Sequence, residues 1–320
     1  MLCLTGPTAA GKTGIALDLA RHHGFEIISV DSALVYRGMD IGSGKPDKAT
    51  LAEIPHHLVD IRDPSQPYSA AEFCEDAKIA MDKIIQSGKK PLLVGGTMLY
   101  FKALRDGMAS MPSANPQIRR QILDLAAQKG WQAVHDRLAE VDPASADRIH
   151  PNDPQRLQRA LEIYETTGKT MSEHHSEEQA AKDQQTDPGG MSNLVFIAIH
   201  PRQRAVLHEQ IARRFQQMLD AGFIDEVKVL YGRGDLDQGL PAIRSVGYRQ
   251  VWDYLEGRRD YDSMVASAVA ATRQLAKRQL TWLRSWPDLH RIEFELSSDS
   301  EKSVNKCLKI HEEVTINDLV

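Results

Sequence analysis

Cysteine is scarce in this chain of 320 residues. The three cysteines, Cys3, Cys74 and Cys307, lie far apart and form no CxxC pair, so they indicate neither a metal-binding set nor a disulfide framework. We expect them to be reduced, buried thiols. The paired histidines, such as His56 and His57, are neighbours in sequence and lack the i,i+4 spacing of a helical metal site.

Long apolar runs are also absent. No run approaches the roughly 18 residues of a spanning helix, and the first residues, MLCLTGPTAAGKT, show neither a charged leader nor a cleavage site. We therefore expect a cytoplasmic protein without a membrane partner. The net charge of -5 argues against indiscriminate nucleic-acid binding, but residues 201–291 carry 15 Lys and Arg against 11 Asp and Glu. This local excess predicts an anion-binding surface.

The chain is longer than one typical compact domain, which predicts a main core and a second module. Its first hundred residues alternate β-rich runs with helical patterns, as in a parallel sheet wrapped by helices. The predicted strands are 2–5, 26–30, 57–61 and 91–94, with a later return at 194–201. The predicted helices between and after them are 11–23, 69–87, 97–105, 203–220, 224–231, 245–255 and 262–286.

Between these two stretches the pattern is helical and contains no strand. Helices are predicted at 116–129, 131–140 and 154–167, so we interpret 111–193 as an inserted all-helical subdomain. Its last part, 172–193, is polar and closes with Pro-Gly-Gly, which predicts a mobile linker. The core would then comprise 1–110 and 194–291, and 292–320 would be an acidic tail outside it.

One motif carries chemistry by itself. Residues 6–13, GPTAAGKT, satisfy GxxxxGK[ST] between a predicted strand and a predicted helix. Backbone amides and the helix N-terminus would surround an anion, Lys12 would reach its terminal phosphate, and the Thr13 hydroxyl would ligate Mg²⁺. The motif predicts an α/β fold with a P-loop NTPase-like parallel sheet and a phosphate site formed by Gly6, Pro7, Thr8, Ala9, Ala10, Gly11, Lys12 and Thr13.

The motif does not specify the reaction, and its default interpretation is nucleotide binding, with ATP used by a hydrolase or kinase. Two absences weaken that interpretation: the chain has no NKxD motif, and Gly95 and Gly96 stand where a hydrolase would place an Asp for Mg²⁺. The acid at a strand end is instead Asp31. From its position alone, Asp31 fits a general base and a Mg²⁺ ligand equally well.

Several segments together point to a family. GPTAAGKT, ISVDSALVYRGMDIGSGKP, PHHLVDIRDPSQPYSAAEF, LLVGGTMLYFKAL, RIHPNDPQRLQRALEIY, FQQMLDAGFIDEV, IRSVGYRQVWDYL and TRQLAKRQLTWLR occur in the order seen in bacterial tRNA dimethylallyltransferases. The chain resembles that family over about residues 1–290. The resemblance implies a dimethylallyl diphosphate donor, Mg²⁺ as cofactor and tRNA as acceptor, with the insertion gripping the tRNA. Residues 172–193 match no family pattern, and the first strand begins at the start of the chain.

The resemblance also assigns roles at the reacting centre. Asp31 would take the proton of the adenine amine, and Thr8 would assist at the bridging oxygen of the diphosphate. Arg214 would bind the same diphosphate. Without the resemblance, Thr8 would be interpreted as a loop-stabilising hydroxyl and Arg214 as a solvated helix arginine.

For tRNA, the resemblance implies three groups of contacts. A stacked adenine must flip out of the anticodon loop to reach a buried donor. Proteins that recognise RNA sequence commonly bind such unstacked bases of loops. The implied contacts are Asp31, Ser32, Ala33 and Leu34; then Thr97, Arg119, Gln155, Arg156, Leu157, Gln158 and Arg159; then Arg244, Ser245, Val246, Gly247, Tyr248 and Arg249. Arg273 and Lys277 would face phosphates or simply form a solvated basic face.

The expected reaction is transfer of a dimethylallyl group to the adenosine 3′ of the anticodon, in tRNAs that read codons beginning with U, by a monomeric enzyme. A free-adenylate prenyltransferase is one alternative, but it would have no use for the insertion or for RSVGYR. A P-loop nucleotide kinase or ATPase is a second alternative. A non-enzymatic tRNA-binding module is the third.

Overall fold

Six parallel strands form the central sheet of the chain, which a computed structural model describes for residues 1–107, 111–112, 114–184, 190–191, 193–294 and 300–317. The sheet order is β3-β2-β4-β1-β5-β6, and every pairing is parallel. The strands are β1 (Leu2–Thr5), β2 (Phe25–Val30), β3 (His56–His57), β4 (Lys90–Gly95), β5 (Val195–Pro201) and β6 (Leu289–Phe294). This architecture confirms the α/β class predicted from the sequence.

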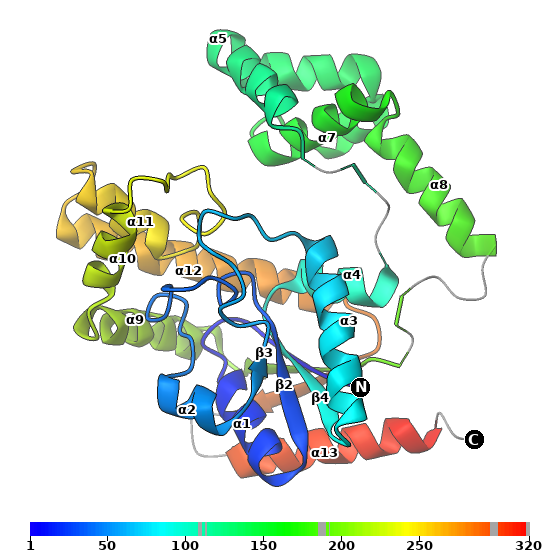
Figure 1. Cartoon of the computed structure of the whole chain (residues 1–320), viewed down its shortest axis with the longest axis vertical. Helices are drawn as coiled ribbons and strands as arrows, with labels where there is room; N and C mark the ends of the chain where they lie inside the picture. Colours follow the sequence, from blue (N-terminus) through cyan, green and yellow to red (C-terminus); the bar gives the residue numbers. More distant parts are fainter. Residues whose placement is uncertain (108–110, 113, 185–189, 192, 295–299, 318–320) are drawn as a thin grey trace. The chain divides into compact units, whose positions relative to one another are not determined.

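Helices cover both faces of the sheet (Figure 1). Along β1, Leu2 and Leu4 pack with residues of α1 and α13, whereas Cys3 belongs to the cluster that includes α3 and α4. This alternation follows from the two-residue period of a strand. The helices of this unit are α1 (Lys12–His22), α2 (Lys48–Glu53), α3 (Ala70–Gln86), α4 (Met98–Asp106), α9 (Arg204–Asp220), α10 (Phe223–Tyr231), α11 (Tyr248–Leu255), α12 (Tyr261–Arg284) and α13 (Ser300–Asn317).

The third strand is shorter than predicted. We expected 57–61, but β3 ends at His57 because Leu58 and Asp60 have φ angles of 63° and 57°. A left-handed residue cannot continue an extended strand. The segment after β3 is therefore a turn rather than a strand.

The C-terminal segment is part of the core, which corrects the prediction of an acidic tail at 292–320. Strand β6 pairs with β5 along its length, from Leu289 opposite Phe196 to Phe294 opposite Pro201. Helix α13 packs on α1, and its Val304 and Cys307 are buried in the same cluster as Ile15. The prediction failed because α13 is polar except on this one face.

Residues 106–190 form a separate unit, and its described secondary structure is entirely helical. Its helices are α5 (Pro116–Val141), α6 (Pro143–Arg148), α7 (Pro154–Thr167) and α8 (Met171–Gln184). The predicted helices 116–129 and 131–140 correspond to the two segments of α5, which are separated by non-helical backbone at Gly130, where φ is 80° and ψ is 165°. The apolar side chains of Val134 and Leu157 belong to the hydrophobic core of this unit and are fully buried there.

Much of the predicted mobile linker is helix α8. Its first turn is anchored because Ser172 donates from Oγ to Asp142 Oδ1 at 2.7 Å and from its backbone N to Oδ2 at 3.1 Å. The composition of this segment predicted a linker because α8 is polar around its whole circumference. Positions 185–189 and 192 of the predicted linker lie outside the described residues.

The chain leaves the sheet unit and returns to it at adjacent points. Met191 donates its backbone N–H to the carbonyl of Leu104 at 3.0 Å. The helical unit is therefore inserted between two backbone segments that are hydrogen-bonded to each other.

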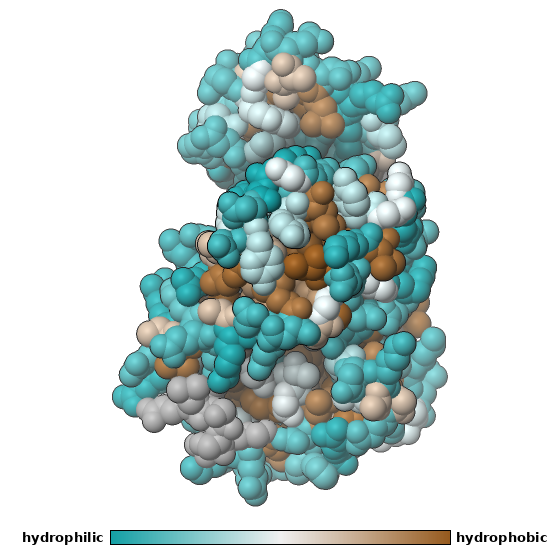
Figure 2. Space-filling model, turned by 90° about the vertical axis from the view of Figure 1, so that its left-hand side faces the viewer, coloured by the Kyte–Doolittle hydropathy of each residue, from teal (hydrophilic) through white to brown (hydrophobic). Residues whose placement is uncertain are grey.

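The visible face in Figure 2 is mainly hydrophilic, with apolar residues between the polar ones. Within the described part of the chain, no helix combines the length and the hydropathy that a membrane crossing requires.

Candidate active site

Three loops meet at the carboxyl edge of the sheet. Thr5, Val30 and Gly95 are register partners at the ends of β1, β2 and β4. The residues that follow them, Gly6, Asp31 and Gly96, must therefore begin three neighbouring loops. Ligands of open α/β sheets bind at this edge.

The 6–13 loop has a backbone that requires glycine at two positions. Gly6 has a φ of 150° and lies so close to the carbonyl of Ile199 that a side chain there would collide with backbone. Gly11 has a φ of 81° and caps α1. Between them, Ala10 N–H donates to Pro7 O at 3.3 Å, which folds the loop over the start of the helix.

Lys12 lies inside this loop. Its Nζ donates to the carbonyl oxygens of Gly6 at 2.9 Å and Pro7 at 2.8 Å. Burial and, to a smaller extent, nearby Arg214 lower the pKa of Lys12 to about 8, with Asp31 acting in the opposite direction. Because burial disfavours the charged form of Lys12, an anion bound beside the ammonium would stabilise it.

Arg214 reaches the same place from α9. Its guanidinium lies against the backbone of Gly44, where a side chain would displace it. Burial lowers the pKa of Arg214, with Asp31 acting in the opposite direction. Arg214 is therefore not the solvated helix arginine suggested by its position in the sequence. Two cations and one carboxylate give this edge of the sheet a net positive charge.

The Asp31 carboxylate is held in a fixed orientation. Its Oδ1 accepts hydrogen bonds from the backbone N–H groups of Ala33 at 2.8 Å and Leu34 at 3.4 Å. The next backbone N–H, that of Ser32, donates to Thr97 Oγ1 at 3.1 Å. Thus four predicted contact residues, Asp31 to Leu34, are brought together with Thr97 at the mouth of the site.

Glu226 organises the loop against which Arg214 packs, and the sequence did not reveal it. Its carboxylate accepts from the backbone N–H groups of Asp40 at 2.8 Å, Ile41 at 2.7 Å and Gly42 at 3.1 Å. The nearest sequence signal is its place in the first turn of α10, where acids are common. Its partners lie about 185 residues earlier, for example Ile41 with a separation of 185.

Gln279 is the second residue that sequence reasoning missed. It lies on α12 and is only 8% exposed. Its side-chain amide accepts from Thr8 N at 2.8 Å and donates to Gly96 O at 2.9 Å. The sequence signal of the segment around it, TRQLAKRQ, is its positive charge, which points to Arg273 and Lys277 rather than to Gln279.

The predicted contacts at 244–249 divide into exposed and buried residues. Arg244 and Arg249 are exposed, and Ser245 and Val246 are half-buried. Gly247 and Tyr248 are buried, and Tyr248 is 0% exposed, with its ring edge-on to Phe223. In this conformation the ring of Tyr248 is therefore part of the core and has no exposed surface to offer to RNA.

In the helical unit, the predicted contacts gather around one carboxylate. Glu162 is fully buried and accepts from Arg119 Nε at 2.8 Å, Arg159 Nη1 at 2.8 Å and the Asn115 N–H at 2.7 Å. Gln158 donates to the backbone oxygen of Arg119 at 3.3 Å.

The remaining predicted contacts of this unit differ in exposure. Gln155 and Arg156 are exposed, and the Arg156 side chain is 71% exposed beside Asp153. Leu157 has no exposed surface. Its side chain packs inside the unit and supports the exposed neighbours.

The residues of the site are compatible with Mg²⁺ as an ion shared with a phosphate ligand. Thr13 is exposed at the first turn of α1. Among the residues placed in the structure, no group of three or more His, Cys, Asp or Glu side chains is arranged so that it could hold a metal ion. Mg²⁺ commonly uses one or two protein oxygens together with substrate phosphates. The Thr13 hydroxyl is suited to that arrangement.

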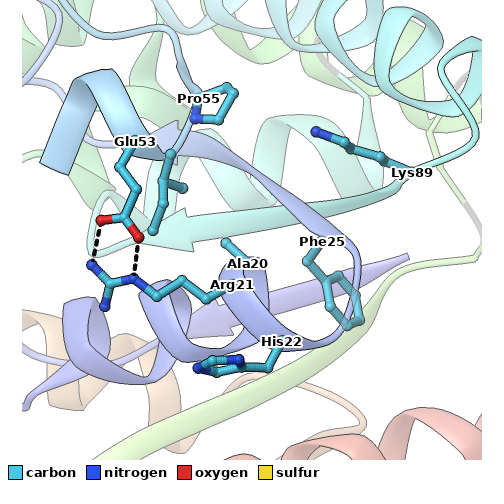
Figure 3. Close-up of a pocket in the computed structure, with 8 residues that line it drawn as sticks. Ala20, Arg21, His22, Phe25, Glu53, Pro55 and Lys89 are labelled. Carbon is cyan, nitrogen blue, oxygen red and sulfur yellow. Dashed lines mark hydrogen bonds and ion pairs between the residues drawn. The ribbon is translucent and has the colours of Figure 1, made fainter.

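A hollow on the surface lies at the other end of the sheet (Figure 3). Its lining comes from the end of α1 and from residues before or at the start of β2, β3 and β4: Ala20, Arg21, His22, Phe25, Glu53, Ile54, Pro55 and Lys89. Arg21 and Glu53 there form two hydrogen bonds of 2.8 Å with each other. This hollow is separate from the carboxyl edge where the charged groups converge.

A parallel α/β sheet with a GxxxxGK[ST] loop, two half-buried cations and one oriented carboxylate defines a phosphate-binding enzyme fold. Residues 34–286 match the family model of the IPP transferases. The match spans more than half of the chain, so the chain belongs to the IPP transferase family and is a transferase.

Solved structures agree with this membership. The tRNA isopentenylpyrophosphate transferase of Bacillus halodurans is 34% identical with a TM-score of 0.70, and 100% of this chain and 99% of that chain are covered. The corresponding transferase of Staphylococcus epidermidis is 30% identical with a TM-score of 0.68 and the same coverage. A eukaryotic dimethylallyltransferase acting on tRNA is 25% identical with a TM-score of 0.80, covering 99% of this chain and 79% of that one. The family resemblance inferred from the motifs is thereby confirmed.

Proposed function

We propose that the chain transfers a dimethylallyl group from dimethylallyl diphosphate to the exocyclic amine of the adenosine directly 3′ of the anticodon. The tRNAs would be those that read codons beginning with U. The observation that carries this proposal is the placement of Lys12 and Arg214 around the same edge as Asp31, within electrostatic reach of one another. Cations stabilise the negative charge of a leaving diphosphate, and a carboxylate can accept the proton that the amine loses.

The donor half of the reaction uses the 6–13 loop. Lys12, the loop amides and Arg214 would bind the diphosphate and stabilise the charge that grows as the bond between the allylic carbon and oxygen breaks. The Thr8 hydroxyl would donate to the bridging oxygen. Mg²⁺, bound through the Thr13 hydroxyl, would supply further charge neutralisation on the diphosphate.

The acceptor half uses the loop after β2. The adenine, flipped out of the anticodon loop, would enter beside Ser32, Ala33 and Leu34. Its amine nitrogen forms the new bond to the allylic carbon and passes its proton to Asp31. The hydrogen bonds to Oδ1 keep that carboxylate turned toward one position while Oδ2 accepts the proton.

Binding of tRNA would involve both units. Exposed Arg244 and Arg249 in the sheet unit, and Gln155 and Arg156 in the helical unit, present polar side chains suited to phosphates and base edges. Arg119, Gln158 and Arg159 would contribute through the parts of their side chains that Glu162 leaves accessible. We propose that the enzyme acts as a monomer in the cytoplasm, where mature tRNA is found.

Mass spectrometry of unmodified tRNA incubated with the chain, Mg²⁺ and dimethylallyl diphosphate tests the proposal. The expected product carries one dimethylallyl unit on the adenosine 3′ of the anticodon, and diphosphate is released in equal amount. Omission of Mg²⁺ should abolish or strongly reduce the gain. A tRNA whose adenosine at that position is replaced by guanosine serves as the matched substrate control.

Two competing functions make different predictions in the same assay. A free-adenylate prenyltransferase would modify AMP as efficiently as tRNA. A nucleotide kinase or ATPase would consume ATP with no need for the prenyl donor. Equal modification of AMP and tRNA, or consumption of ATP without a mass gain on tRNA, would overturn the proposal.

A further inference from the structure

The side-chain amide of Gln279 joins two loops of the site that are far apart in sequence. Its Oε1 accepts the backbone N–H of Thr8 at 2.8 Å, across 271 positions. Its Nε2 donates to the carbonyl of Gly96 at 2.9 Å, across 183 positions. Since the side chain is only 8% exposed, both of these hydrogen bonds are largely shielded from water.

Each of the two loops belongs to a different half of the reaction. Thr8 is in the loop that would bind the leaving diphosphate. Gly96 directly precedes Thr97, whose Oγ1 accepts the backbone N–H of Ser32 at 3.1 Å. Ser32 in turn directly follows Asp31. A continuous path of hydrogen bonds and peptide units therefore runs from Thr8 through Gln279, Gly96 and Thr97 to Asp31.

The absence of a side chain at position 96 makes room for this bridge. A Cβ on Gly96 would collide with the Gln279 amide nitrogen, so a larger residue would push the amide away from the carbonyl. An amide also suits the two partners because it offers one acceptor and one donor. A carboxylate would keep the acceptor for Thr8 but place a negative oxygen against the Gly96 carbonyl.

We infer that Gln279 is a positioning residue, which fixes the separation between the diphosphate-binding loop and the loop that carries the base. This inference rests on the proposed function. Gln279 has no role as a proton donor or acceptor in the reaction. It acts by holding Thr8 and, through Thr97, Asp31 at the distance that in-line transfer needs. Small errors in such distances have large kinetic effects, about 100-fold for a shift of roughly 1 Å.

The test compares Gln279→Met with Gln279→Glu and Gln279→Ala. Met keeps the length and packing of the side chain without either hydrogen bond, and Glu keeps only the acceptor. We expect kcat for transfer to fall about 10- to 100-fold in all three variants, with KM for tRNA within about twofold of the wild type, because the tRNA-facing residues are unchanged. Gln86→Ala, at an exposed position at the end of α3, is the control and should leave all constants unchanged.

A second measurement does not depend on activity. Hydrogen exchange of the peptide containing Thr8 should accelerate in Gln279→Met and remain close to wild type in Gln279→Glu, because only Glu preserves the acceptor for the Thr8 N–H. If Gln279→Met has the same kcat as the wild type, Gln279 acts by packing alone and the inference is overturned. If exchange at Thr8 is unchanged in Gln279→Met, the bridge does not hold the loop and the inference also fails.

These outcomes are distinct from failure of the proposed function. An inactive wild-type chain with the expected exchange pattern would refute prenyl transfer while leaving the bridge between the loops intact. An active wild-type chain whose Gln279→Met variant matches it in kcat would refute only the positioning role.

Discussion

Tyr248 donates its hydroxyl hydrogen to the Glu226 carboxylate at 2.6 Å. The same carboxylate holds three consecutive backbone N–H groups of the loop at 40–42, and burial followed by the charge of Glu226 raises the pKa of Tyr248. The ring lies 5.0 Å from that of Phe223, edge to face. A residue expected to touch RNA thus joins α10, α11 and the loop beside Arg214 into one packed assembly.

Replacing Tyr248 tests this structural role. Tyr248→Phe keeps the ring but removes a buried hydrogen bond to a charged group, which should lower the free energy of unfolding by about 1.5–3 kcal/mol. KM for tRNA should stay within about twofold, since the ring is inaccessible. Chemical denaturation and steady-state kinetics measure the two effects. Arg249→Ala, which removes an exposed side chain nearby, should show the reverse pattern, and equal effects of both variants on KM would contradict our view of Tyr248.

The lowered pKa of Lys12 predicts that binding of dimethylallyl diphosphate depends on pH. Because the pKa of Lys12 is lowered to about 8, the ammonium loses its charge as the pH rises through that value. The ratio kcat/KM for dimethylallyl diphosphate reports groups of the free enzyme and should therefore decline above about pH 8. In Lys12→Arg the charge persists, so any remaining activity should lack this decline. An unchanged alkaline limb in Lys12→Arg would assign the effect to another group.

Asp31 should be needed for the chemical step and dispensable for donor binding. Asp31→Asn removes the proton acceptor, and we expect kcat to fall roughly 10²- to 10⁴-fold. The dissociation constant for the donor should stay equal or decrease, because a negative charge near Lys12 and Arg214 has been removed. Calorimetric titration and single-turnover transfer separate the two quantities. Asp82→Asn, an exposed substitution on α3, is the charge-matched control; weaker donor binding in Asp31→Asn alone would indicate a role in holding Mg²⁺ instead.

Glu162 should be the main polar determinant of stability in the helical unit. Glu162→Gln weakens its hydrogen bonds to two arginines and should lower the stability of that unit by about 2 kcal/mol, measured by hydrogen exchange over 116–167. Glu165→Gln, exposed on the same helix and 3.8 Å from Arg137, should change it by less than about 1 kcal/mol.

The effect of Glu162 should also depend on pH. Burial acts to raise the pKa of Glu162, but hydrogen bonds from Arg119, Arg159 and Asn115 outweigh it, so the pKa is below its usual 4.5. A carboxylate with a lowered pKa stabilises the folded state above its unfolded pKa and loses this contribution as the pH falls through the folded value. The difference between wild type and Glu162→Gln should therefore shrink below about pH 4.5. A constant difference would show that the charge of Glu162 is not what matters.

The sequence was most informative where local patterns determine structure. Alternating strands and helices predicted the parallel sheet, and the GxxxxGK[ST] spacing located a loop at the end of β1. It was least informative for polar helices that pack on one narrow face. Helix α13 buries Val304 and Cys307 against the sheet, and the first turn of α8 is hydrogen-bonded to Asp142. Composition alone made both of them appear unstructured.

The parts of the site that escaped prediction are contacts between distant positions. Glu226 meets Ile41 across 185 residues, and Gln279 meets Thr8 across 271. No local pattern marks a glutamate or glutamine that caps a backbone so far away. Burial was equally hidden at Tyr248 and Leu157, because a motif shows which residues occur together but not which of them face inward.

The hydrogen bond between Met191 and Leu104 brings together the two points at which the chain leaves and re-enters the sheet unit. Because the ends of the excursion are already joined in the sheet unit, a short glycine bridge in place of 106–190 would span almost no distance. The remaining polypeptide should fold without the helical unit. It should still bind dimethylallyl diphosphate, but it would lose the tRNA contacts that we propose for the helical unit. The architecture thus allows the helical unit to be exchanged for another while the residues of the sheet unit that surround Lys12 stay unchanged.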